Sequence, residues 1–116
     1  MPAAIQVVTT TANKPDAEKI ATALVQQRLA ACVQVDGPLL SCYRWQGAIE
    51  TAEEWRCTIK TTPEAYAQVE QAIRQLHPYE VPEILATPIV AGSPAYLDWL
   101  REQVYVPLPH RDPRAT

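Results

Sequence analysis

The chain has 116 residues, 47% of them hydrophobic and 20% charged, which suits a folded protein with a single core. Its net charge of -3 comes from 10 basic and 13 acidic residues scattered along the sequence, so nucleic acid and anionic membranes are poor partners. No signal-peptide pattern or membrane-spanning apolar run is present, and we expect a cytoplasmic protein with free thiols at Cys32, Cys42 and Cys57.

The N-terminal part of the chain predicts a strand followed by a helix. Residues 5–11 form a short, apolar run that is rich in β-branched side chains, which favours a strand. Asn13 and Pro15 supply helix-start chemistry, and apolar residues then recur at three- and four-residue spacing. We therefore predict an amphipathic helix from Pro15 to Ala30.

Two long extended segments follow and predict a hairpin. The first, residues 32–45, is interrupted at Gly37 and Pro38, which indicates a bent or bulged strand. Gln46-Gly47 is typical of a tight turn, and residues 48–61 then resume the extended pattern. In this second segment, apolar Trp55, Cys57 and Ile59 alternate with polar Arg56, Thr58 and Lys60. One face of the strand is therefore expected to lie on a core and the other toward water or a partner. We interpret Glu50, Glu53 and Glu54 as solvated charges at the hairpin end.

A second helix begins after this hairpin. Thr62 is expected to cap it with its hydroxyl group, with Pro63 in the first turn. The apolar stripe consists of Tyr66, Val69, Ile73 and Leu76. His77-Pro78 should end the helix, because the residue before proline is pushed away from helical geometry.

The last elements are a strand and a short helix. Residues 84–91 are almost continuously apolar, which suits a strand buried on both faces, although Pro88 fits only at an edge or a bulge. Ser93-Pro94 begins a third helix that runs to Gln103. We assign residues 1–106 to one domain and 107–116 to a proline-rich C-terminal tail, disordered or draped on the surface.

This order of elements predicts an α+β, ferredoxin-like fold (βαββαβ plus a C-terminal helix) with both crossover helices on one face of an antiparallel sheet. The other face then has no helix of its own. Because it still carries apolar residues, and because short chains bury little surface alone, another subunit is the economical cover.

Five segments together resemble the CutA family of divalent-cation tolerance proteins. They are Ala30-Ala31-Cys32-Val33, Ser41-Cys42-Tyr43-Arg44-Trp45-Gln46-Gly47, Ile59-Lys60-Thr61-Thr62, His77-Pro78-Tyr79-Glu80-Val81-Pro82-Glu83 and Tyr96-Leu97-Asp98-Trp99-Leu100. The resemblance implies a homotrimer with PII-like architecture, in which the long bent hairpin pairs across subunits. It also implies a role in divalent-metal, and specifically copper, tolerance.

Metal binding would centre on His77, because His110 lies in the tail. Some members of the family carry a metal-linked cysteine and a doubled histidine where this chain has Thr9 and Leu76-His77, so one of those three ligands is retained. In a trimer, Glu80, Glu83 or a neighbouring Cys32 could complete a site for Cu(II) or another divalent cation. The alternative is that His77 caps the helix end and hydrogen-bonds at an interface.

A cleft between subunits is the second candidate site. Six residues could line it for a small ligand: Tyr43, Trp45, Lys60, His77, Tyr79 and Glu83. The alternative is that the aromatic residues pack in the core or interface, and that Lys60 is solvated or pairs with Glu83.

No catalytic motif is present, so we predict a non-enzymatic homotrimer without an obligatory cofactor. Its leading function is divalent metal (copper) tolerance, and the identity of any downstream protein partner stays open. One alternative is a PII-like sensor that binds a small metabolite in the intersubunit cleft. Another is a hydrolase or transferase that uses a cysteine with His77.

Overall fold

Four strands form one antiparallel sheet in the order β2-β3-β1-β4. The computed structural model describes residues 2–106, with β1 (Ala4–Thr11) between β3 (Ala48–Thr61) and β4 (Leu85–Ile89), and with β2 (Cys32–Trp45) on the far side of β3. This is the strand order of a ferredoxin-like fold, so the predicted α+β class is confirmed. The predicted tail, residues 107–116, lies outside the described residues.

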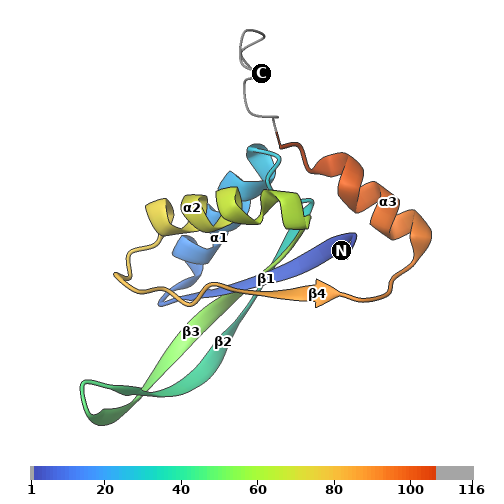
Figure 1. Cartoon of the computed structure of the whole chain (residues 1–116). Coiled ribbons are helices and arrows are strands. Elements are labelled where there is room, and N and C mark those ends of the chain that lie inside the picture. The colour runs from blue at the N-terminus through green and yellow to red at the C-terminus, as the bar shows by residue number, and fades with distance from the viewer. Residues whose placement is uncertain (1, 107–116) are drawn as a thin grey trace, which may run out of the picture.

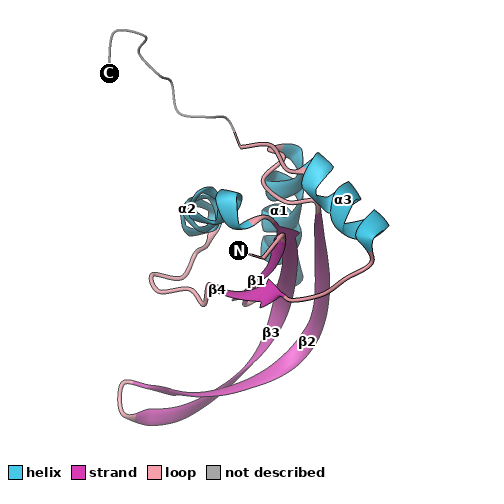
Figure 2. Ribbon diagram, turned by 45° about the vertical axis from the view of Figure 1, so that its right-hand side comes forward, coloured by secondary structure: helices cyan, strands magenta, loops and turns pink. Residues whose placement is uncertain are grey.

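Two helices, α1 (Lys14–Gln26) and α2 (Tyr66–Leu76), cover the same face of the sheet, whereas α3 (Pro94–Gln103) lies at its side (Figures 1 and 2). The core lies between these two helices and the sheet. Its fully buried large members are Val7, Ile20, Leu24, Ile59, Val69 and Ile73. No helix among residues 2–106 is long and apolar enough to cross a membrane.

The first helix ends at Gln26 and not at Ala30 as predicted. Arg28 takes the left-handed conformation, with φ at 58°, and the amide of Leu29 donates to the carbonyl oxygen of Leu24 at 3.0 Å. This is a helix stop of the Schellman type, which usually uses glycine. The helix was predicted too long because the apolar spacing continues past this stop, where Leu29 still packs in the core.

The β2–β3 hairpin is longer than the sheet that it belongs to and projects from the body (Figures 1 and 2). A register shift between Asp36 and Leu39 confirms the predicted bulge, and Gln46 and Gly47 form the predicted turn with φ of 50° and 81°. At the bulge the backbone of Gly37 lies so close to the ring of Trp55 that a Cβ atom would be 2.7 Å from it.

The start of α2 differs from the prediction. Residues 63–65 form a short 3-10 turn, and the hydroxyl of Thr62 makes no capping hydrogen bond. The carbonyl oxygen of Thr62 instead accepts from the amide of Ala65 at 3.1 Å, so the main chain satisfies a donor that the side chain was expected to take. The predicted end at His77 is confirmed, with ψ of 131° at that residue.

The fourth strand is short and lies at the sheet edge, so the prediction of a strand buried on both faces is wrong for this chain alone. Leu85 is 61% exposed and Val90 91% exposed. The edge position agrees with Pro88, which cannot donate to a ladder. Ser93 caps α3 as predicted, since its hydroxyl accepts from the amide of Tyr96 at 3.4 Å.

The face of the sheet opposite α1 and α2 is more polar than predicted. Pairing register places Val8, Leu85 and Ile89 on it, but also Gln34, Asp36, Thr58 and Lys60. Arg56 on this face forms an ion pair with Asp36 at 2.9 Å, exposed to solvent. Any partner covering this face must therefore meet both apolar and charged side chains.

The contact between Gly37 and Trp55 gives a direct test of the hairpin geometry. We expect Gly37→Ala to lower the free energy of unfolding by about 1–3 kcal/mol, because the added methyl group overlaps the indole ring. Gly47→Asn is the matched control, since nothing lies within 4 Å of a Cβ there and asparagine tolerates positive φ. Urea denaturation measures both, and equal stability of the two variants would contradict the packing described.

Candidate functional site

A hydrogen-bonded cluster lies at the foot of the hairpin, where the loop after α2 meets the end of β1. His77 is only 7% exposed there. Its Nε2 lies 2.6 Å from the carbonyl oxygen of Thr10, and its Nδ1 accepts from the amide of Tyr79 at 3.1 Å. A carbonyl oxygen can only accept, so these partners require the neutral tautomer with the proton on Nε2. Both ring nitrogens are therefore occupied, and a metal would have to displace one of these bonds.

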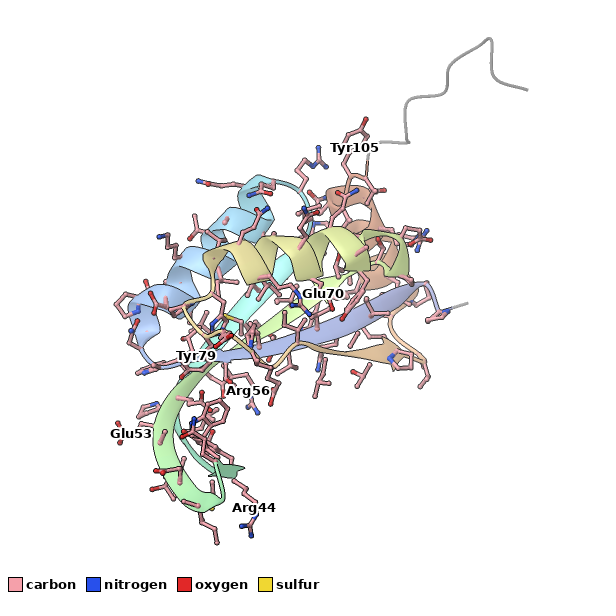
Figure 3. The ribbon with its side chains drawn as sticks, turned by 60° about the vertical axis from the view of Figure 1, so that its left-hand side comes forward. Arg44, Glu53, Arg56, Glu70, Tyr79 and Tyr105 are labelled. Atoms are coloured by element: carbon pink, nitrogen blue, oxygen red, sulfur yellow. The ribbon has the colours of Figure 1, made fainter. Side chains whose placement is uncertain are left out.

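Tyr79 extends the cluster toward the hairpin (Figure 3). Its hydroxyl donates to Oε2 of Glu54 at 3.2 Å, and its ring lies 4.7 Å from that of His77 between centroids. Burial and the carboxylate of Glu54 raise the pKa of Tyr79, with smaller contributions from Tyr43 and Asp16. The phenol is thus held in its neutral, hydrogen-donating form.

The interpretation of Glu54 as a solvated hairpin charge is wrong, because it is 9% exposed and bonded to Tyr79. The alternation in β3 places Glu54 with the exposed Arg56, on the side away from the helices. The sequence pattern therefore gave no sign that Glu54 is buried. Glu53 does point away from the body, as Figure 3 shows, and it and Glu50 are exposed as predicted.

The remaining predicted cleft residues lie apart from this cluster within one chain. Lys60 lies on the helix-free face, where its Nζ donates to Oε1 of Gln34 at 2.8 Å, so the expected pairing with Glu83 is not made. Trp45 lies at the hairpin tip, 56% exposed. Glu83 is exposed in the loop before β4. Of the six predicted residues, His77 and Tyr79 contact each other, and Tyr43 is close enough to Tyr79 to affect its pKa.

Two of the predicted metal ligands, Cys32 and His77, are also separated within one chain. Cys32 pairs with Lys60 on β3, and Lys60 pairs with Gln6 on β1, whereas His77 bonds to Thr10. Gln6 and Thr10 are four residues apart along β1, so Cys32 and His77 lie about 13 Å apart along the strand direction. Among residues 2–106 there is no group of three histidine, cysteine, aspartate or glutamate side chains placed to hold a metal ion. A site that combines His77 with Cys32, or that has three such ligands, thus needs a second chain.

Cys57 is a core residue and not a reactive thiol. Its Sγ donates to the carbonyl oxygen of Ala17 at 3.4 Å, and burial, with a smaller effect of Asp36, raises its pKa to about 11. Since thiolate is the reactive form, this thiol is a poor nucleophile at neutral pH.

The family model for "CutA1 divalent ion tolerance protein" matches residues 5–103. The chain belongs to the CutA1 family. It is 47% identical over 96 residues to the divalent-cation tolerance protein CutA of Thermus thermophilus, covering 83% of this chain and 93% of that one. A solved structure of the divalent cation tolerance protein from the same species superposes with a TM-score of 0.86 at 44% identity, over 88% of this chain and 99% of the other.

Other relatives differ in length and described location. The mouse protein CutA is 37% identical over 90 residues, which cover 78% of this chain but 51% of the mouse sequence. A structure from Archaeoglobus fulgidus, described as a periplasmic divalent cation tolerance protein, has a TM-score of 0.85 at 36% identity over 88% of this chain and 99% of that one. Family membership therefore does not fix a compartment.

The Tyr79–Glu54 hydrogen bond can be tested by removing one oxygen atom. We expect Tyr79→Phe to lower the free energy of unfolding by about 1–3 kcal/mol, because it leaves a buried carboxylate without its donor. Tyr105→Phe is the control, since that side chain is 62% exposed, and its stability should stay within about 0.5 kcal/mol of the wild type.

The same pair gives a pH signature. The native pKa of Tyr79 is raised, so its stabilising effect is complete below the ordinary tyrosine pKa of about 10 and is lost as pH rises through the native value. Alkaline denaturation should therefore separate wild type from Tyr79→Phe less and less above pH of about 10. A constant difference up to the highest pH would show that the phenol proton has no role.

Proposed function

We propose that this chain is a non-enzymatic homotrimer that acts in divalent-cation tolerance in the cytoplasm, with Cu(II) as the leading cation. Family membership supports the tolerance role. The three unpaired thiols suit a reducing compartment. The main support for a trimer is the end of the β2–β3 hairpin, which no other element of the described chain covers.

This uncovered end has no third strand. The last pair between β1 and β3 joins Thr11 to Trp55, so residues 48–54 of β3 pair with β2 alone. Two-stranded ribbons are marginally stable in water without something to pack against. Leu40 is 75% exposed and Ile49 69% exposed, and their register places them on one face of the ribbon. Copies of the chain closed around a three-fold axis would cover this face without open-ended growth.

A metal site would form where chains meet. His77 and Glu80 lie near the foot of the hairpin, and a neighbouring chain could add Cys32, which is partly exposed on the edge strand β2. Imidazole, thiolate and carboxylate are ligands that Cu(II) and Zn(II) accept. Binding through His77 must break its bond to Thr10 or to Tyr79, so we expect it to rearrange the loop after α2.

The trimer is tested by charging the exposed face of the ribbon. We expect the double variant Leu40→Glu/Ile49→Glu to lower the mass measured by light scattering from three chains to one, because burying two carboxylates between chains is unfavourable. Val25→Glu is the control, an exposed valine on α1 that should leave the assembly intact. A stable, folded wild-type monomer at low concentration would contradict the trimer.

The cation is tested by calorimetric titration with Cu(II) and Zn(II). We expect His77→Ala to weaken binding at least about tenfold and Glu80→Gln to weaken it less, because imidazole is the stronger ligand for Cu(II). Glu18→Gln, an exposed carboxylate on α1, should bind like the wild type. Circular dichroism and light scattering check that each variant is folded and assembled. Equal, weak heats from wild type and His77→Ala would end the site hypothesis.

The metabolite-sensor alternative makes a different prediction in the same assays. A small anionic ligand in the intersubunit cleft would raise the melting temperature of the trimer, whereas metals would not. The three relatives described above are all named for CutA and not as metabolite sensors, so we place this alternative second.

A further inference from the structure

Beyond the bulge, the two faces of the β2–β3 ribbon differ in exposure. Alternate cross-strand pairs place six side chains on one face, which we call the Glu54 face: Leu39 with Glu54, Ser41 with Ala52, and Tyr43 with Glu50. Glu54 is buried, and Leu39, Ser41 and Ala52 are partly buried. The residues between them in sequence, 40, 42, 51 and 53, point to the opposite face and are all exposed. The Glu54 face is therefore partly covered within a single chain.

Tyr79, from the loop after α2, covers one end of this face. Its hydroxyl donates to Oε2 of Glu54 at 3.2 Å. Burial and Glu54 raise the pKa of Tyr79, and Tyr43, at the other end of the face, adds to this effect. Both rings stay accessible, since Tyr43 is 44% and Tyr79 38% exposed. The pair between them consists of the small residues Ser41 and Ala52, so the face has a small-residue floor with an aromatic ring at each end.

The charge of Glu54 has no cationic partner among residues 2–106. The side chain is 9% exposed, and in this part of the chain it accepts one hydrogen bond, from the neutral phenol of Tyr79. None of the ion pairs between described residues includes it. Arg56 is the next side chain along this face of β3, but it donates to both oxygens of Asp36, at 3.2 and 2.9 Å. Because a buried carboxylate is costly without a compensating cation, Glu54 is suited to receive one.

The outer part of the face has the same character. Glu50 adds a second carboxylate opposite Tyr43, and Trp45, one pair nearer the tip, is 56% exposed. The ribbon carries no lysine or arginine on this face between Leu39 and Glu54. Carboxylates beside exposed aromatic rings favour ammonium and guanidinium groups, which pair with the carboxylate and stack on the ring. The same groups repel an anion.

We propose that the Glu54 face binds an organic cation in which an alkyl chain carries an ammonium or guanidinium group. The charged group pairs with the carboxylate of Glu54. The rings of Tyr43 and Tyr79 contact it from either end of the face. The alkyl chain lies over the floor formed by Ser41 and Ala52.

This site is separate from the proposed trimer contact and differs in charge from the sensor alternative. Leu40 and Ile49, which the trimer would cover, lie on the opposite face of the ribbon. The sensor alternative places an anion near Tyr43 and Tyr79, whereas the charge of Glu54 selects a cation. Loss of the trimer would therefore leave the proposal standing, and failure of the proposal would leave the trimer standing.

The test is a calorimetric titration of the full chain with putrescine and with N-acetyl-argininamide. 1,4-Butanediol, the uncharged analogue of putrescine, is the control ligand and should not bind. We expect Glu54→Gln to weaken binding of both cations about tenfold or more, because its amide still accepts from Tyr79 but carries no charge. Ala52→Leu should weaken binding as well, because it fills the floor. Tighter binding of putrescine would identify a free amine as the ligand, and tighter binding of N-acetyl-argininamide a protein side chain.

Glu53→Gln is the matched control variant. It removes the same charge from the adjacent residue, whose side chain points away from the body (Figure 3), and binding should stay within about twofold of the wild type. Circular dichroism checks that each variant is folded. Equal heats from putrescine and butanediol, or no saturation by about 10 mM of either cation, would overturn the proposal. An equal loss in Glu53→Gln and Glu54→Gln would also overturn it, because it would show only a general effect of net charge.

Discussion

The structure depends on a hairpin that is longer than the sheet it belongs to. The strands β2 and β3 have 14 residues each, against 8 in β1 and 5 in β4, so part of the ribbon has neither a third strand nor a helix to pack on. Its exposed apolar side chains lie on this part. In a monomer, such a ribbon would expose apolar side chains and unpaired main-chain groups at its edge. The proposed self-association is the simplest way to cover them.

The cluster at the foot of this ribbon is chemically closed within one chain. Both ring nitrogens of His77 bond to main-chain partners, and the hydroxyl of Tyr79 donates a hydrogen bond to Glu54. Such a network fixes the loop after α2 relative to β1 and β3, which is a structural role in its own right. A metal that binds here must compete with these bonds, so affinity and loop rearrangement are coupled in the proposed function.

Much of the fold was predictable because its signals are local. The alternation around Cys57 and Ile59 predicted the face of β3, and the Gly37-Pro38 and Gln46-Gly47 pairs predicted the bulge and the turn. The end of α1 was missed because Arg28, and not glycine, takes the left-handed position. The exposure of β4 was missed because an apolar run looks the same whether its own chain or another copy covers it.

The candidate site was less predictable than the fold. The motif around His77 and Tyr79 drew attention to the correct loop, but their partners Thr10 and Glu54 are distant in sequence. A main-chain acceptor leaves no residue signature, and a buried glutamate looks like a solvated one in a charged strand. The sequence could therefore indicate which residues are special, but not that they bond to one another within a single chain.

Arg28 shows how one unusual residue organises a region that the family motifs do not describe. Its left-handed backbone ends α1 early enough for β2 to begin at Cys32, and its side chain holds the C-terminus of α3. Glycine there would relax the backbone but remove both side-chain bonds, so its strain of about 1 kcal/mol is offset by capping. Through these bonds, and through its carbonyl oxygen, which accepts from the amide of Tyr105, Arg28 joins the end of α1 to the main chain that follows α3.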